Sequence, residues 1–116
     1  MATITIWHNP RCSKSRSALA IIEDHGVTPV EVRYLETPPS RDEIVNALAA
    51  LKMEAKDIIR KGEALYKSLD LSVASTNEQI LDALVANPIL IERPIVISGD
   101  RAIIGRPPEN VLLLLE

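Results

Sequence analysis

The amino-acid sequence predicts an α/β domain built on a mixed sheet, and three observations favour this fold class. Runs rich in β-branched residues alternate with helical patterns in the order strand, helix, strand, helical block, strand, strand, helix. Ser40 and Glu43 have the spacing of a capping box, just ahead of the helical block. The Gly99-Asp100-Arg101 turn between two apolar runs is typical of a hairpin. This order predicts one crossover and one terminal hairpin.

The N-terminal part predicts a strand followed by a helix. Residues Thr3–Trp7 form the strand, which leads into the turn His8-Asn9-Pro10. Ser13 or Ser15 then caps a helix that ends near Gly26. Its apolar residues share one helical face: Ala18, Leu19 and Ile22.

A second strand and a helical block come next. Residues Pro29–Leu35 alternate enough to form the strand, one side of which carries Val30, Val32 and Tyr34. Pro38-Pro39 breaks the chain. Residues 40–87 then have the pattern of several short helices, the last of which begins near Thr76.

The C-terminal part predicts two strands and a helix. The apolar runs Ile95–Ser98 and Ala102–Ile104 form the hairpin. Pro107-Pro108 starts a terminal helix that runs through Val111 to Leu115, because proline is accepted in a first turn. We find no internal repeat or linker, so we expect residues 1–116 to form a single domain.

The composition restricts the possible functions. The 116 residues include 13 Lys and Arg, 16 Asp and Glu, and one cysteine, which excludes an internal disulfide framework and a multi-cysteine metal site. The net charge of −3 argues against a nucleic-acid-binding surface. No apolar run approaches the roughly 20 residues that cross a bilayer, and no secretory signal is visible. We therefore expect a cytoplasmic protein with no bound cofactor or metal and no nucleic-acid or membrane partner. We also expect a monomer, because no extra helix or apolar tail is left over for assembly.

Cys12 is predicted to lie where the first strand gives way to the first helix. The positive end of a helix favours an anion, so this position lowers the pKa of a thiol and raises its reactivity. Arg11, Lys14 and Arg16 add positive charge nearby, and His8 belongs to the same turn. A lone cysteine is more often a small buried core residue, but this polar, cationic segment favours a reactive thiol. His8 can likewise be a turn residue with only local hydrogen bonds.

Three arginines provide a second indication of a functional site, in addition to Cys12. Arg60 follows an apolar pair, whereas Arg93 and Arg106 each precede a proline and are therefore expected in extended backbone. Any one of them can be an ordinary solvated side chain. Strand ends and helix starts are, however, where open sheets bind ligands, and a guanidinium suits the oxygens of a tetrahedral anion. A thiolate facing such arginines is suited to nucleophilic attack on an oxyanion.

The segment ITIWHNPRCSKSR resembles the opening strand and active-site loop of the glutaredoxin-linked arsenate reductase family. Similar segments follow in order over essentially the whole chain: YLETPPSRDE, IIRKGEALYKSLDL, NPILIERPIV and IGRPPE. Within that family the chain is most similar to short members that carry the segment H-N-P-R-C-S-K-S-R. The resemblance implies a thioredoxin-like fold with a helical insertion at about residues 40–87, and a cis peptide bond before Pro94.

The resemblance also implies roles for single residues and a reaction. Cys12 would be the nucleophile, His8 its electrostatic neighbour, and Ser15 a hydrogen-bond donor to the thiolate. The oxyanion would be held by three side chains: Arg60, Arg93 and Arg106. Cys12 would attack arsenate, glutathione as co-substrate would reduce the adduct, and glutaredoxin would resolve the resulting disulfide. With one cysteine in the sequence, the resolving thiol has to come from another molecule.

Two other functions stay open at this point. One is a non-enzymatic stress regulator of the same fold that binds a protein partner such as RNA polymerase. Such regulators commonly use a Cys-x-x-Cys switch, and Ser15 occupies the second position here. The other is a glutathione-dependent reductase that acts on a different substrate.

Overall fold

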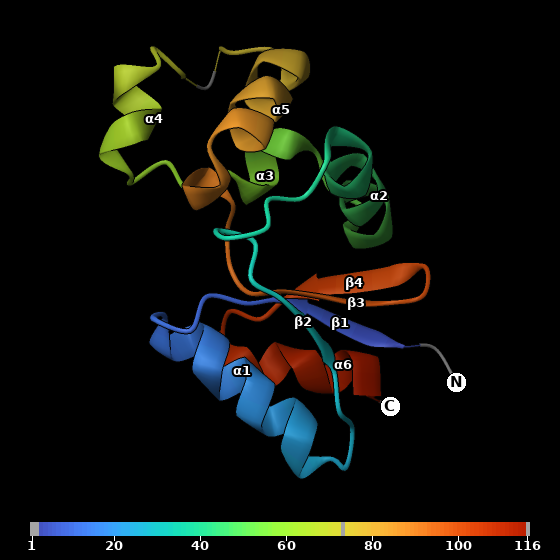
Figure 1. Ribbon diagram of the computed structural model, residues 1–116. Coiled ribbons are helices and arrows are strands. Elements are labelled where there is room, and N and C mark those ends of the chain that lie inside the picture. The colour runs from blue at the N-terminus through green and yellow to red at the C-terminus, as the bar shows by residue number, and fades with distance from the viewer. Residues whose placement is uncertain (1–2, 73, 116) are drawn as a thin grey trace. The chain divides into compact units, whose positions relative to one another are not determined.

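The computed structural model describes residues 3–72 and 74–115, which divide into two compact units. The first, which we call the sheet unit, contains the chain up to Thr37 and from Arg93 onward. The second, which we call the helical unit, is Pro38–Glu92. Figure 1 shows the strands in the first unit and a set of short helices in the second.

The sheet unit is built on four strands, namely β1 (Ile4–Trp7), β2 (Val30–Val32), β3 (Ile95–Ser98) and β4 (Arg101–Ile104). They lie in the order β2-β1-β3-β4. Strand β1 pairs in parallel with β2 through the α1 crossover and antiparallel with β3, and β3 and β4 form an antiparallel hairpin. The mixed four-stranded sheet that the sequence predicts is therefore confirmed.

Helix α1 (Ser13–Asp24) and the C-terminal helices pack against the sheet. The C-terminal helices are the 3-10 helix η2 (Pro108–Val111) and α6 (Leu112–Leu115), and both contact α1 and β4. Figure 1 shows α1 and α6 on one face of the sheet. The core between these elements is aliphatic, as expected for a chain without Phe, and consists of Ile4, Ile6, Ala18, Ile22, Val96, Val111 and Leu114.

The helical unit contains α2 (Arg41–Leu51), α3 (Ala55–Ile58), α4 (Ala64–Ser68), α5 (Asn77–Ala86) and the 3-10 helix η1 (Pro88–Leu90). Reciprocal capping boxes begin α2 at Ser40 and Glu43 and α5 at Thr76 and Gln79. These pairs satisfy backbone N–H groups that a first helical turn leaves without partners. Of the helices in residues 3–72 and 74–115, none is long and apolar enough to cross a membrane.

Three local predictions are corrected. Strand β2 ends at Val32, not at Leu35, because the backbone N–H groups of Glu36 and Thr37 both donate to the carbonyl of Arg33 and close a turn. Helix α1 is capped by Cys12 and by neither Ser13 nor Ser15. The segment after Pro107 begins as a 3-10 helix and becomes α-helical only at Leu112.

Candidate active site

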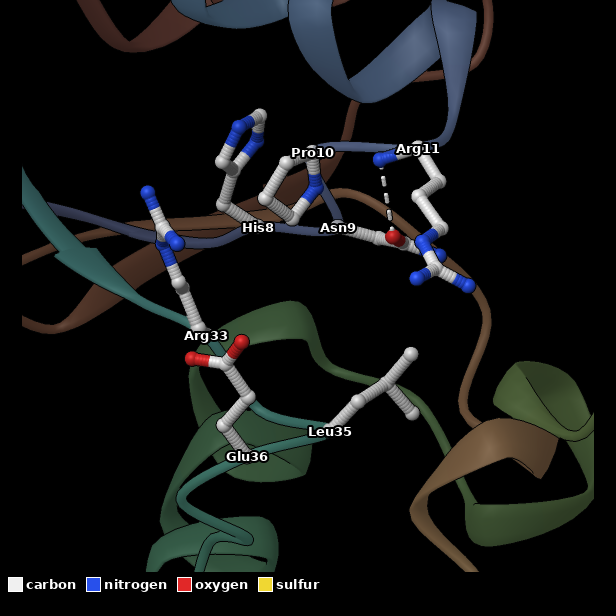
Figure 2. Close-up of a pocket in the computed structure, with 7 residues that line it drawn as sticks. All are labelled: His8, Asn9, Pro10, Arg11, Arg33, Leu35 and Glu36. Carbon is white, nitrogen blue, oxygen red and sulfur yellow. Dashed lines mark hydrogen bonds between the residues drawn. The ribbon is translucent and has the colours of Figure 1, made fainter.

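The loop between β1 and α1 is fixed by backbone hydrogen bonds. The N–H of His8 donates to the carbonyl of Val32 at 2.8 Å, which ties the end of β1 to β2. The N–H of Cys12 donates to the carbonyl of Asn9 at 2.9 Å, and that of Arg11 to Asn9 Oδ1 at 3.0 Å (Figure 2). The carbonyl of Cys12 then accepts from the N–H of Arg16 at 3.0 Å and begins α1. The loop thus holds Cys12 at the N-cap.

Cys12 is half-buried, and its thiol is set up to ionise. Burial is the largest single influence and raises the pKa of Cys12. It is outweighed by the backbone N–H groups of Ser15 and Lys14 and by the guanidinium of Arg93, all of which hydrogen-bond the sulfur. The net effect lowers the pKa of Cys12 below its ordinary value. The thiol at this helix start is therefore more nucleophilic near neutral pH than a free cysteine.

Arg93 brings positive charge to Cys12 from a distant part of the sequence. Burial opposes its charge, but contacts with Cys12 and with the buried Tyr34 raise the pKa of Arg93. Its Nε is buried and hydrogen-bonds no other described residue, so one donor of the guanidinium is unused. The Arg93–Pro94 peptide bond is cis, as the resemblance implies, and so is Arg106–Pro107.

Arg106 is held against the backbone of Arg93. Its Nε donates to the carbonyl oxygen of Arg93 at 2.7 Å, and its own carbonyl accepts from the side-chain amide of Asn110 at 3.0 Å. The two arginines that precede prolines are therefore neighbours, as the prediction of a shared anion site requires. Whether they bind an anion together stays a prediction.

His8 and Ser15 form a buried pair beneath the loop. His8 is 4% exposed and Ser15 0%, and His8 Nδ1 lies 2.7 Å from Ser15 Oγ. The same Oγ accepts from the backbone N–H of Asn9 at 3.1 Å. Burial lowers the pKa of His8, assisted by Arg33 and Arg16 and opposed by Glu31, so the ring is mostly neutral at neutral pH. His8 therefore influences Cys12 by holding Ser15 and the loop in place, and not by placing a full positive charge beside the sulfur.

Two sequence-based expectations differ in detail from this arrangement. Ser15 contacts the sulfur through its backbone N–H, while its hydroxyl bonds to His8 and Asn9. Arg16 points its guanidinium at the carbonyl of Pro10, at 2.8 Å, and thereby braces the loop. Sequence reasoning assigned no role to Tyr34, which it placed in a strand. The only signal was that Tyr34 is one of two tyrosines in a chain without Phe.

Arg60 belongs to the helical unit, whereas Cys12, Arg93 and Arg106 belong to the sheet unit. Its backbone N–H donates to the carbonyl of Leu90 at 2.7 Å, and its guanidinium forms an ion pair with Glu63 at 2.6 Å. The proposed contact of Arg60 with an oxyanion stays a prediction.

The chemistry available here is that of a cationic thiolate site. A polarised sulfur nucleophile meets the planar guanidinium of Arg93, which has an unused donor, and the guanidinium of Arg106 binds the backbone carbonyl of Arg93. This arrangement suits attack on a tetrahedral oxyanion, whose negative oxygens arginine can hold. In residues 3–72 and 74–115, no group of three or more His, Cys, Asp or Glu side chains could hold a metal ion.

Known proteins are similar to this chain in sequence and in fold. A model of the ArsC family matches residues 7–114. YfgD, an uncharacterised protein of Escherichia coli strain K12, is 47% identical over 111 residues, which cover 94% of this chain and 93% of that protein. An arsenate reductase of Neisseria meningitidis serogroup A is 41% identical over 117 residues, which cover 99% of this chain and 100% of that protein.

A solved structure is also similar to this chain in both fold and sequence. The arsenate reductase from Vibrio cholerae has a TM-score of 0.92 and 41% sequence identity to this chain, and the match covers 97% of each. This likeness confirms the thioredoxin-like α/β fold class that the resemblance implies.

Proposed function

Because this chain belongs to the ArsC family, we propose that it is a thiol-dependent oxidoreductase that reduces arsenate to arsenite. The observation that carries the proposal is the contact of Arg93 with the Cys12 sulfur at the N-cap of α1. It combines an ionisable nucleophile with a cation that can hold the oxygens of the substrate. Relatives named arsenate reductase, at about 40% identity over nearly their whole length, support the choice of substrate.

In the proposed reaction the Cys12 thiolate attacks the arsenic atom. A sulfur–arsenic bond forms, one arsenic–oxygen bond breaks, and the oxygen leaves as water after accepting protons. Arg93 and Arg106 neutralise the remaining oxygens, and we assign Arg60 the same role. Neutral His8 and Ser15 hold the loop so that the N–H groups of Ser15 and Lys14 face the sulfur.

Reduction of arsenic(V) to arsenic(III) takes two electrons, and we propose that two external thiols supply them. One belongs to glutathione and the other to glutaredoxin, and they end as a mixed disulfide while Cys12 returns as a thiol. The single cysteine of the sequence supports this division, because the chain has no second thiol of its own. We further propose that residues 1–116 act as one cytoplasmic domain and as a monomer, with the helical insertion at about 40–87.

The test is arsenate-dependent NADPH consumption in the presence of glutathione, glutathione reductase and glutaredoxin. We expect turnover by the native chain and none above background by Cys12→Ser. Lack of arsenate turnover by the native chain would refute arsenate as the substrate. If the chain then still reduced mixed disulfides, it would be a glutathione-dependent reductase of another substrate.

A further inference from the structure

Tyr34 is a buried residue in a turn whose other side chains lie at the surface. It follows β2, and it is 0% exposed. Arg33, Leu35 and Glu36 are exposed, and Figure 2 shows them beside a cavity of about 380 Å³ between this turn and the loop after β1. Tyr34 does not belong to the lining of that cavity. It is therefore the one residue of the segment 33–36 that the fold buries.

The register of the sheet brings Tyr34 level with Arg93. Trp7, the last residue of β1, pairs with Val32 of β2 and with Ile95 of β3. Tyr34 lies two residues after the first of these partners, and Arg93 lies two residues before the second. Because β1 is parallel to β2 and antiparallel to β3, both positions lie just beyond the end of β1, one on each side of it. The loop that carries the thiol continues from that same end.

The side chains of Tyr34 and Arg93 are in contact at this place. Burial opposes the positive charge of Arg93, and its contacts with the Cys12 sulfur and with the Tyr34 hydroxyl favour that charge. A buried hydroxyl normally keeps a polar partner, because burial without one costs free energy. The titratable groups that act on one another here are thus a thiol, a guanidinium and a phenol, and the guanidinium contacts both of the others.

An arginine that has to meet a thiolate gains from such a second contact. Its side chain is long and has many rotamers, so a contact at its far end costs conformational entropy. The backbone of Arg93 is held by Arg106, whose Nε donates to the Arg93 carbonyl at 2.7 Å, but this bond does not restrain the Arg93 side chain. A contact from a fully buried residue restricts the guanidinium before the thiol ionises.

We propose that Tyr34 is a positioning residue, whose hydroxyl holds the guanidinium of Arg93 against the Cys12 sulfur. Its importance for catalysis rests on the proposed function, because there Arg93 also binds the oxygens of the substrate. The alternative is that Tyr34 only fills the core with its ring, in which case its hydroxyl would not influence the thiol.

The test is the pH dependence of Cys12 alkylation by iodoacetamide, which needs no arsenate. Tyr34→Phe keeps the ring and removes the hydroxyl. We expect the rate below the pKa of the thiol to fall about threefold, because the guanidinium is loosened but not lost. Half of the free energy that corresponds to a tenfold change gives about threefold. Tyr66→Phe is the matched control, because it removes the hydroxyl of the other tyrosine, which is 8% exposed in α4, and should leave the profile unchanged.

A double-mutant cycle shows whether Tyr34 acts through Arg93. In the Arg93→Gln background, Tyr34→Phe should not change the rate further, since the group that Tyr34 positions is gone. A threefold fall in both backgrounds would overturn the proposal, because the hydroxyl would then act on the sulfur directly. An unchanged profile of folded Tyr34→Phe would overturn it as well and would leave Tyr34 as a core residue.

A measurement on the native chain covers the case in which Tyr34→Phe does not fold. With ¹³C at the ring carbon that bears the hydroxyl, the two tyrosines give two resonances, which Tyr66→Phe assigns. The Tyr34 resonance should shift as Cys12 ionises, and the Tyr66 resonance should not. A Tyr34 resonance that stays constant across the ionisation of Cys12 would overturn the proposal. If these results are as expected but arsenate is not turned over, the positioning role stands and only the substrate is refuted.

Discussion

Replacement of Arg93 by glutamine should make Cys12 a weaker nucleophile by a predictable amount. The change removes the guanidinium that hydrogen-bonds the sulfur and keeps the backbone N–H groups of Ser15 and Lys14. A hydrogen bond to a charged group contributes about 1.5–3 kcal/mol, and the lower end applies because both residues are half-buried. About 1.4 kcal/mol corresponds to a tenfold change in an equilibrium. The thiolate-to-thiol ratio below the pKa should therefore fall about tenfold.

The assay is the pH dependence of alkylation by iodoacetamide, whose rate follows the thiolate fraction. The profile of Arg93→Gln should move to higher pH than that of the native chain. Arg101→Gln is the matched control, because it removes the same charge from the sheet unit at a guanidinium that donates to the carbonyl of Leu113. The pH profile of Arg93→Lys should lie between those of the native chain and Arg93→Gln, since lysine keeps the charge but not the planar fork of donors. Identical profiles for Arg93→Gln and Arg101→Gln, with both variants folded by circular dichroism, would refute this account.

Three further predictions concern stability, measured by urea unfolding. Ser15→Ala should lower the free energy of unfolding by about 1–3 kcal/mol, because the Asn9 N–H and the buried His8 ring each lose a hydrogen-bond partner. Ser17→Ala, at an exposed position of the same helix, should lower it far less. The pKa of His8 is lower in the folded chain than its ordinary value of 6.5. The contribution of His8 to the free energy of unfolding is therefore complete above pH 6.5 and is lost as the pH falls through the folded-state pKa. His8→Asn should therefore lose less stability than the native chain over that acidic range. Gly105→Ala should destabilise by about 1–3 kcal/mol, since its Cβ would lie 2.8 Å from Pro94 Cγ, whereas Gly62→Ala meets nothing within 4 Å.

The elements that the sequence predicts well are those whose signals are local. The capping box at Ser40 and Glu43 forms as predicted, because both of its hydrogen bonds join residues within one helical turn. The hairpin at Gly99 likewise follows from its own turn chemistry, with φ of +62° at that glycine. The position of Cys12 at the start of α1 needs only the strand, the turn and the helix on either side of it.

The features that the sequence could not predict depend on packing between distant segments. Strand β2 ends at Val32 because a turn closes on the carbonyl of Arg33. The sequence gives no sign of this turn, because the alternating pattern continues through Tyr34. The use of the Ser15 hydroxyl is set by a buried histidine seven residues away. The pocket lined by Arg11, Arg33 and Glu36 joins two loops whose closeness appears only once β1 and β2 pair.

The reactivity of the thiol is therefore a property of the assembled sheet unit, and not of the loop that carries it. Two of its stabilising donors, the N–H groups of Ser15 and Lys14, form with α1, whereas Arg93 arrives only when β3 pairs antiparallel with β1. Burial opposes ionisation throughout, so the helix donors and the guanidinium have to act together to lower the pKa of Cys12. In the unfolded chain these contacts are absent and the thiol returns to its ordinary pKa. An activated Cys12 thus requires the same sheet pairing that brings in Arg93, whose unused donor we propose as a contact for a substrate oxygen.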